Sequence, residues 1–297
     1  MSDVLMYPVK YEGDIYRPPS EARSLILQAT IGCSHNRCTF CKMYKRKKYR
    51  VRDFRELETE IVLVSQMMPK TKRIFLADGN ALSIPFEQLA EILRALQNAF
   101  PHLERVSLYG NPQDLLEKSV EQLEELKSLK LGIIYLGIES GSAAVLENIN
   151  KGVTPQQVVE GASRAKEAGV PLSITIINGL AGAEGSAEHA KETAALLNKI
   201  DPEYVGLLSL MTEPGTTMHR RFKEGLLTPL SPWELLKEIR MMVEGLSLTN
   251  CVFRANHASN YLPLGGNLPA DRDRIVSLID AALSGEIPLR PDESRGL

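Results

Sequence analysis

The sequence is poor in cysteine, in tryptophan and in long apolar runs. Its 297 residues include four cysteines and one tryptophan, and no apolar run reaches the about 18 residues that a membrane-spanning helix needs. Few cysteines and no secretory signal at the N-terminus exclude a disulfide-stabilised scaffold and predict a reducing, cytoplasmic location. A formal net charge of −2 lacks the positive field of general nucleic-acid binders. The composition predicts a globular protein without a membrane partner.

Three of the four cysteines are concentrated in one place. Cys33, Cys38 and Cys41 lie within nine consecutive residues, directly after an apolar run at 24–30. Thiolates gathered on one short loop are ligands for a soft metal or an iron–sulfur cluster. Three ligands would leave one iron of a [4Fe–4S] cluster open to another molecule. The alternative, a zinc site completed by His35 or His257, lacks a second ligand pair at zinc-finger spacing.

Apolar segments and amphipathic segments alternate along the chain. The predicted strands are residues 24–30, 73–77, 105–109, 132–138, 172–177 and 204–210, and helices are predicted from residue 54 and over 84–99, 119–129, 154–168, 186–200 and 232–246. Near-continuous apolar strands separated by helices favour a parallel sheet covered by those helices. Six units are two fewer than a closed barrel contains, so we expect an α/β partial (β/α)6 barrel with its site at the carboxyl ends of the strands.

This pattern also predicts the domain organisation. Residues 1–23 are expected to form an N-terminal arm, 24–248 the core, and 249–297 a C-terminal extension that closes the barrel mouth. The extension contains an apolar segment and then a helix at about residues 268–284, which Pro269 opens.

Two segments resemble one known family. The Cys-x4-Cys-x2-Cys loop, with Phe40 directly before the last cysteine, resembles the cluster loop of the radical S-adenosylmethionine (radical SAM) enzymes, although it has one more residue between the first two cysteines. The segment that begins at Leu136 and contains Glu139 resembles the branch of oxygen-independent coproporphyrinogen oxidases and tRNA methylthiotransferases. Matching segments follow in order over residues 24–218. The resemblance implies a [4Fe–4S] cluster held by the three cysteines, S-adenosylmethionine, and a one-electron reductant of the flavodoxin or ferredoxin type.

The resemblance also implies contacts to S-adenosylmethionine at successive strand ends. The turn at residues 78–80 corresponds to the one that takes the methionine amino group, and Glu139 to the residue that accepts hydrogen bonds from the ribose hydroxyls. Arg164 is a candidate for the methionine carboxylate, with a surface arginine as the alternative. Residues 178–184 and 208–210 correspond to segments that line the adenine. The complete expected set is Phe40, Asp78, Gly79, Asn80, Glu139, Ser140, Arg164, Asn178 and Leu210.

The resemblance implies that S-adenosylmethionine is cleaved reductively to a 5′-deoxyadenosyl radical, which takes hydrogen from a substrate that the sequence does not identify. Polar residues that follow strands are the expected substrate contacts: Asn111, Arg254, Asn256, His257, Asn260 and Tyr261. Cys251 is expected to pack as a small apolar residue, and with no other cysteine left a second cluster is disfavoured.

Two alternative functions stay open. One is a non-catalytic haem-binding relative, or haem chaperone, of the same branch. The other is an RNA-modifying enzyme that contacts nucleic acid through the basic segment 42–52, for which the competing interpretation is a solvated loop.

Overall fold

The computed structural model describes residues 9–296, which divide into two compact units. Unit 1 contains residues 9–36, 43–135 and 164–171, and unit 2 contains residues 37–42, 136–163 and 172–296. The loop with the three cysteines therefore contributes to both units, because Cys33 belongs to the first and Cys38 and Cys41 to the second.

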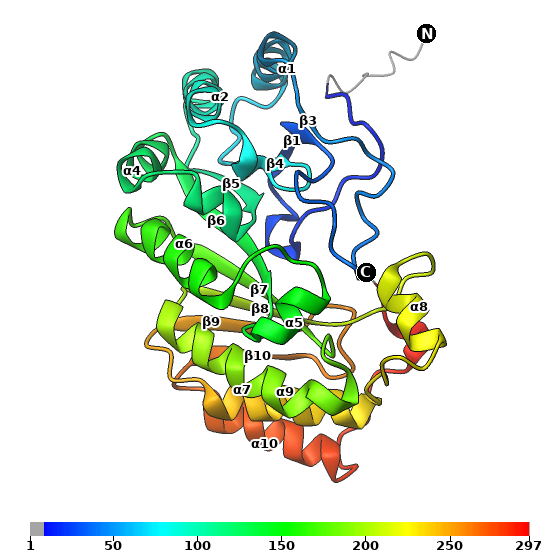
Figure 1. Cartoon of the computed structure of the whole chain (residues 1–297). Coiled ribbons are helices and arrows are strands. Elements are labelled where there is room, and N and C mark those ends of the chain that lie inside the picture. Colours follow the sequence, from blue (N-terminus) through cyan, green and yellow to red (C-terminus); the bar gives the residue numbers. More distant parts are fainter. Residues whose placement is uncertain (1–8, 297) are drawn as a thin grey trace, which may run out of the picture. The chain divides into compact units, whose positions relative to one another are not determined.

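Unit 1 is built on parallel strands with helices beside them (Figure 1). Strand β4 pairs in parallel with β1 and with β5, and β2 and β3 form a separate antiparallel pair. Its elements are η1 (Pro19–Glu21), β1 (Leu25–Gln28), β2 (Thr30–Ile31), β3 (Arg50–Val51), α1 (Phe54–Met67), β4 (Arg73–Ala77), η2 (Ala81–Ser83), α2 (Phe86–Ala99), β5 (Arg105–Gly110), α3 (Pro112–Leu116) and α4 (Val120–Ser128).

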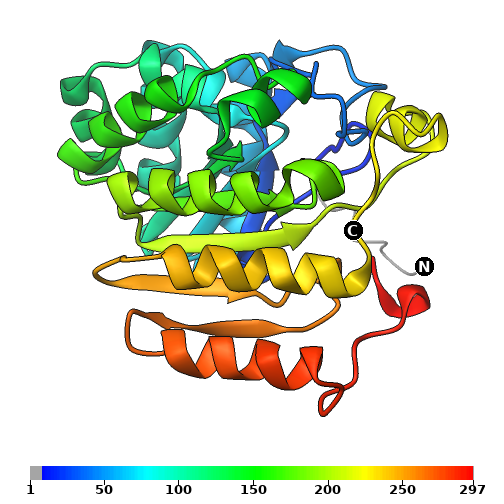
Figure 2. The same cartoon turned by 60° about the horizontal axis from the view of Figure 1, so that its bottom comes forward.

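Unit 2 continues the alternation and ends in a hairpin. Strands β7, β8 and β9 are parallel neighbours, and β10 pairs with β9 in the antiparallel direction. Helices α7, α9 and α10 lie side by side along these strands (Figure 2). Its elements are α5 (Ala143–Asn148), β7 (Leu172–Asn178), α7 (Gly182–Ile200), β8 (Tyr204–Ser209), α8 (Thr217–Lys223), α9 (Pro232–Gly245), β9 (Cys251–Ala255), β10 (Leu264–Leu268), α10 (Arg272–Leu283) and η3 (Asp292–Ser294).

Two elements contribute residues to both units. Strand β6 (Leu131–Glu139) gives residues 131–135 to unit 1 and 136–139 to unit 2, and helix α6 (Pro155–Glu167) divides after residue 163. The hydrogen-bonded strand order is β1-β4-β5-β6-β7-β8-β9-β10. The predicted α/β fold with a mostly parallel sheet is thereby confirmed.

The differences from the predicted elements have local causes. The run at 24–30 forms β1 and the start of β2. Residues Leu25–Gln28 pair with β4, whereas Thr30 and Ile31 pair with Val51 and Arg50 of β3. Helices α5 and α8 were not predicted, since each is shorter than two and a half turns and gives little periodicity. The apolar segment after residue 249 forms the β9–β10 hairpin. Closure of the barrel mouth by the extension stays a prediction.

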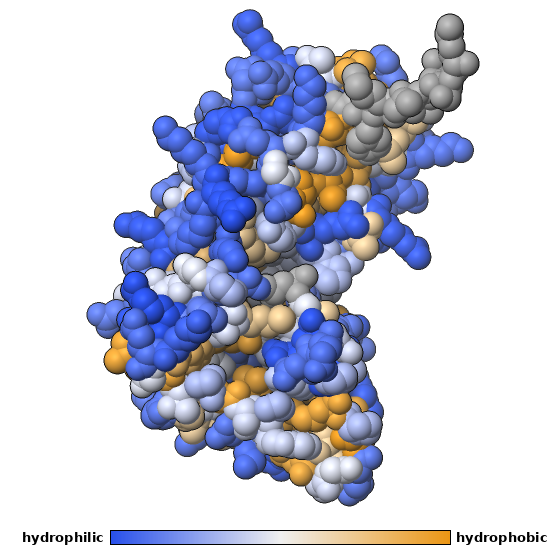
Figure 3. Space-filling view, turned by 90° about the vertical axis from the view of Figure 1, so that its right-hand side faces the viewer, coloured by the Kyte–Doolittle hydropathy of each residue, from blue (hydrophilic) through white to orange (hydrophobic). Residues whose placement is uncertain are grey.

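The surface is mostly hydrophilic on the face that Figure 3 shows, and apolar residues appear there in separate patches. Isolated exposed apolar side chains are ordinary on globular proteins. Within residues 9–296 the large exposed ones are Tyr11, Met43, Val62, Leu63, Met67, Met68, Tyr204, Leu226 and Trp233. Within residues 9–296, no helix is long and apolar enough to cross a membrane.

Candidate functional site

The turn after β4 fixes the start of the cysteine loop. The buried carboxylate of Asp78 accepts hydrogen bonds at Oδ2 from the Gly32 N–H, 3.0 Å away, and from Lys47 Nζ, 2.7 Å away. The pair with Lys47 is almost completely removed from solvent, so each charge depends on the other. The second oxygen, Oδ1, is buried and has no hydrogen-bond partner among the described residues. Asp78 thus holds Gly32, the residue before Cys33, in place, and its Oδ1 stays available as an acceptor.

Gly79 brings its backbone directly against the cysteine loop. A Cβ atom at this position would lie 2.6 Å from Cys33 Cα and 2.7 Å from Cys33 Cβ, and would also meet the Gly32 carbonyl oxygen. A side chain here would have to displace backbone. Glycine is therefore required by contact with Cys33.

Asn80 holds the next residue of the same loop. Its Oδ1 accepts from the Ser34 N–H at 2.9 Å, and its Nδ2 donates to Ser34 Oγ and to Asp114 Oδ2. Asp114 also accepts from the Asn111 N–H at 2.8 Å, in the capping box of α3. Asn111 and Asn80 are thus placed in one network that supports the loop, and any cofactor or substrate contact by them stays a prediction. Asp114 was missed, although Asn-Pro-x-Asp is a capping signal.

The second half of the cysteine loop is held by unit 2. The Thr39 N–H donates to the Ile149 carbonyl at 2.9 Å, and the Met218 N–H donates to the Thr39 carbonyl at 3.0 Å. Phe40 and Leu210 pack on one apolar cluster, formed by Val145, Leu146, Ile149, Leu180 and Met218. Helices α5 and α8, which the sequence did not predict, therefore position the segment between Cys38 and Cys41.

The three loop cysteines are all half-buried, whereas Cys251 is buried. Burial raises the pKa of the Cys251 thiol to about 12, which suits an inert packing residue. Within residues 9–296, no three His, Cys, Asp or Glu side chains are grouped closely enough to hold a metal ion. The set of three cysteine ligands therefore stays a prediction.

Glu139 ends β6 in an unusual backbone conformation and forms a buried ion pair. Its φ is 68°, and its Oε1 lies 2.8 Å from Nζ of Lys151. A Cβ on Gly137 would lie 2.6 Å from that same oxygen, so this glycine makes room for the carboxylate. Lys151 was not predicted from the sequence, although it lies within the segment that carries the family resemblance.

Ser140 begins a buried polar chain that links three elements. Its hydroxyl lies 2.8 Å from Nδ1 of His189 in α7, and His189 Nε2 lies 3.2 Å from the Ile177 carbonyl in β7. Nε2–H donates to that carbonyl, so Nδ1 accepts from Ser140. Burial lowers the pKa of His189 to about 4, which keeps the ring neutral at pH 7. His189 was not predicted from the sequence.

Glu238 in α9 continues this chain to the turn after β7. Its Oε1 accepts from the Gly179 N–H at 2.7 Å and lies 3.6 Å from His189 Nε2. Burial raises the pKa of the Glu238 carboxyl to about 7. Asn178 precedes the turn and donates from Nδ2 to the Leu235 carbonyl at 3.0 Å. Its buried Oδ1 has no hydrogen-bond partner within residues 9–296.

Arg164 has a structural task in unit 1. Its Nη1 donates to the Leu116 carbonyl at 2.7 Å and to the Lys118 carbonyl at 3.2 Å. These bonds tie α6 to the segment between α3 and α4. The expected contact of Arg164 with a carboxylate stays a prediction.

Three of the predicted substrate residues hold the segment after β9 in place. Asn260 is buried and bonds Ser209 Oγ and the Leu207 carbonyl at the end of β8, both at 2.8 Å. Tyr261 donates to Asp292, and His257 Nδ1 lies 3.0 Å from Ser259 Oγ. Burial, and to a smaller extent the charge of Arg290, lower the pKa of His257. Of the remaining three, Asn111 belongs to the capping box of α3, and Arg254 and Asn256 line a pocket on the hairpin.

Comparison with known proteins agrees with the predicted family. Residues 27–197 match the family model of the radical SAM superfamily. The heme chaperone HemW of Bacillus subtilis is 25% identical over 203 residues, which cover 66% of this chain and 52% of HemW. The tRNA-2-methylthio-N(6)-dimethylallyladenosine synthase of Chloroherpeton thalassium is 25% identical over 218 residues, which cover 71% of this chain and 47% of the synthase. The chain spans about half the length of these relatives.

Solved structures share the fold at low sequence identity. Coproporphyrinogen III oxidase HemN of Escherichia coli, a radical SAM enzyme, superposes with a TM-score of 0.55 and 16% identity over 74% of this chain and 51% of HemN. Methylornithine synthase PylB superposes with a TM-score of 0.52 and 16% identity over 90% of this chain and 83% of PylB. The predicted branch and partial-barrel fold class are confirmed.

The contact of Gly79 with Cys33 predicts a sensitive position. Gly79→Ala should destabilise the protein by about 1–3 kcal/mol, because the new methyl group displaces backbone. It should also lower the iron retained after reconstitution, since the displaced backbone carries Cys33. Denaturant unfolding and iron analysis test both effects. Gly296→Ala is the control, because a Cβ there meets nothing within 4 Å, and equal behaviour of the two variants would contradict the assignment.

The buried Glu238 carboxyl predicts a pH-dependent stability. Because its folded-state pKa of about 7 lies above the ordinary 4.5, its stabilising contribution is complete below pH 4.5 and is lost as the pH rises through 7. Glu238→Gln keeps the shape and removes this titration. Between pH 5 and pH 8, wild type should lose about 2–3 kcal/mol of unfolding free energy relative to Glu238→Gln.

The comparison with Glu238→Gln is needed because titration of His189 changes the free energy of unfolding in the opposite direction. Its folded-state pKa of about 4 lies below 6.5, so its contribution is lost as the pH falls from 6.5 through 4. Denaturant unfolding at each pH gives the difference, and parallel curves for the two proteins would disprove the role of Glu238.

Proposed function

The chain belongs to the radical SAM superfamily, and on this premise we propose that it is a radical enzyme with a [4Fe–4S] cluster and S-adenosylmethionine. The chemistry that these bound groups supply is reductive cleavage to methionine and a 5′-deoxyadenosyl radical, which takes a hydrogen atom from the substrate. The cysteine loop carries this proposal. Its three half-buried thiols are soft ligands of the kind that an iron–sulfur cluster uses.

The contacts of the loop hold the backbone beside each cysteine within that cysteine's own unit. Asp78, Gly79 and Asn80 fix the backbone on both sides of Cys33, and Thr39 fixes the backbone between Cys38 and Cys41. A loop that is held at several points loses little further conformational entropy when it takes up a ligand. These residues would orient the thiols.

The buried acceptors at the strand ends fit the hydrogen-bond donors of S-adenosylmethionine. Asp78 Oδ1 and Asn178 Oδ1 are buried and have no partner among the described residues, and a buried acceptor without a partner is costly. Asp78 would accept from the methionine amino group, and Asn178 from the amino group of the adenine. Glu139 would accept from the ribose hydroxyls, held in place by its pair with Lys151.

The methionine carboxylate has a better candidate partner than Arg164. Nη1 of Arg164 donates to two backbone carbonyls of the segment between α3 and α4, which directs this side chain to a structural contact. Lys151 is buried beside Glu139, and a carboxylate that approaches this pair would meet its ammonium group. We therefore assign the carboxylate contact to Lys151.

The reductant, the location and the substrate belong to the same proposal. A one-electron donor of the flavodoxin or ferredoxin type would reduce the cluster, in a cytoplasmic setting that protects it from oxygen. Two of the similar proteins are named a heme chaperone and a tRNA-modifying synthase, but the chain spans only about half of each. Neither haem nor tRNA is therefore assigned as its ligand.

The basic segment 42–52 gives little support to the RNA alternative. Four of its cations form ion pairs within the chain: Lys42 with Glu213, Lys47 with Asp78, Arg50 with Glu12, and Arg52 with Glu60. Two of these pairs are largely buried, so their cations are used by the fold. Contact with RNA stays a prediction.

Single substitutions of the four cysteines test the proposed activity. After anaerobic reconstitution with iron and sulfide, wild type should produce 5′-deoxyadenosine from S-adenosylmethionine on reduction, whereas Cys33→Ala, Cys38→Ala and Cys41→Ala should produce none. Cys251→Ala is the matched control and should keep the product, because this thiol is buried in β9 and lies outside the loop segment. Tight zinc without a cluster, or undiminished product from Cys38→Ala, would refute the proposal.

The pair of Glu139 and Lys151 predicts a specific binding defect. Glu139→Gln removes a charged acceptor, so the dissociation constant for S-adenosylmethionine should rise about tenfold. The melting temperature should also fall, since the buried Lys151 loses its counter-ion. Titration calorimetry and thermal unfolding of reconstituted protein measure the two effects. Glu147→Gln, an exposed glutamate on α5, is the control, and an unchanged affinity in Glu139→Gln would remove this residue from the site.

A further inference from the structure

Arg254 is exposed in the interior of a paired strand. Strand β9 lies between β8 and β10, and its residues Phe253 and Ala255 face the other side and are fully buried. Arg254 faces away from them, and so does Asn256 two residues later, because strand side chains alternate. A full charge on this face needs a reason beyond packing.

The two strand neighbours of Arg254 are both glycines. In register, Gly206 of β8 and Gly265 of β10 lie opposite Arg254. A Cβ on Gly206 would meet only the Ile174 carbonyl, at 3.8 Å, and a Cβ on Gly265 would lie 3.4 Å from the Arg254 side chain. The residues on both sides therefore have no side chain to cover the guanidinium.

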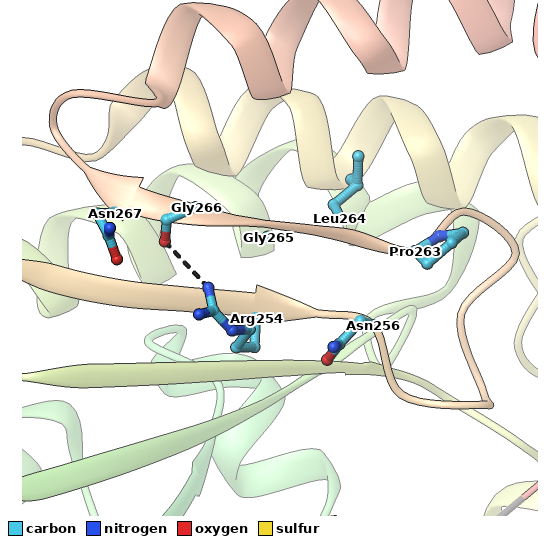
Figure 4. A pocket seen from close by; sticks show the side chains of 7 residues that line it. All are labelled: Arg254, Asn256, Pro263, Leu264, Gly265, Gly266 and Asn267. Carbon is cyan, nitrogen blue, oxygen red and sulfur yellow. Dashed lines mark hydrogen bonds between the residues drawn. The ribbon is translucent and has the colours of Figure 1, made fainter. Parts of the chain in front are cut away.

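A pocket of about 420 Å³ opens over this place (Figure 4). Such a volume is within the range of small-molecule sites. The pocket is lined by Arg254, Asn256, Pro263, Leu264, Gly265, Gly266 and Asn267. Arg254 is the only cation among these residues, and the two asparagines add neutral amide donors and acceptors.

The guanidinium is held in place while most of its donors remain. Nη1 donates to the Phe253 carbonyl at 2.9 Å and to the Gly266 carbonyl at 3.4 Å, whereas a guanidinium has five N–H donors on three nitrogens. Asp271 is the acidic group whose pKa responds to Arg254. That carboxylate is bound mainly by the Asn267 N–H and Arg274, and these bonds, with a smaller effect of Arg254, lower its pKa.

We infer that this pocket binds the carboxylate group of the substrate, with Arg254 as the charged contact and Asn256 and Asn267 as neutral ones. One guanidinium matches a singly charged carboxylate through two parallel hydrogen bonds. A phosphate group carries up to two charges and favours a site with several cations. The pocket lies toward the carboxyl end of β9, which is parallel to β8, and ligands bind at that end of such sheets. The term substrate rests on the proposed function, and the binding site itself does not.

Two probes of equal shape test the charge requirement. Benzoate and benzamide would be titrated into the full-length reconstituted protein, with the Arg254 Nε–H resonance, assigned by its loss in Arg254→Lys, as the readout. Benzoate should shift this resonance saturably and benzamide should not. Titration calorimetry gives the benzoate affinity of each variant, since the variants lack this resonance. Arg254→Gln should weaken benzoate binding at least tenfold, and Arg254→Lys less, because lysine keeps the charge but loses the planar fork.

The control is Arg73→Gln, an exposed arginine at the start of β4, which should bind benzoate as wild type does. The inference is overturned if benzoate does not bind, if benzamide binds equally well, or if Arg254→Gln keeps its affinity. Inorganic phosphate binding more tightly than benzoate would overturn the carboxylate assignment. The titration does not measure 5′-deoxyadenosine, so failure of this site and failure of the proposed radical chemistry give different results.

Discussion

Several parallel strands of this chain end in polar groups that the fold buries, among them β4, β6 and β7, and most of the buried polar atoms there have hydrogen-bond partners. Asp78 follows β4, and its Oδ2 accepts from Lys47 and from the Gly32 N–H. Ser140 follows β6 and is satisfied by His189. Since an unpaired buried polar group costs about 1–3 kcal/mol, these bonds fix the loops at the strand ends. The site residues are held in position by the same interactions that stabilise the fold.

The fold was largely predictable because its signals are local. Apolar strands, amphipathic helices and caps lie in neighbouring residues, so periodicity located most elements. The two short helices α5 and α8 carry too few turns for such a signal. Their importance appears only in three dimensions, where the Ile149 carbonyl and the Met218 N–H bond to Thr39 in the cysteine loop.

The candidate site was predictable in composition but only partly in roles. Arg164 and Asn260 were expected to contact ligands, because arginine and asparagine are common ligand-binding residues. Both bond backbone carbonyls, with Leu116 and Leu207 among the acceptors, and their contacts with ligands stay predictions. The partners of a long polar side chain depend on segments far away in the sequence, 48 residues for Arg164 and 53 for Asn260. No local pattern reports such a contact.

Two charged residues of unit 2, Lys151 and Arg254, differ in their surroundings. Lys151 is buried and its charge is balanced by Glu139, so a ligand there must compete with, or complete, an existing ion pair. Arg254 is exposed between Gly206 and Gly265, and its Nη1 meets only neutral carbonyls. An anion near Arg254 therefore meets a guanidinium that no carboxylate among the described residues hydrogen-bonds and that Asp271 affects only weakly, whereas near Lys151 it shares the ammonium with Glu139. We therefore expect the β9–β10 hairpin to contribute more to the recognition of an anionic group than the end of β6 does.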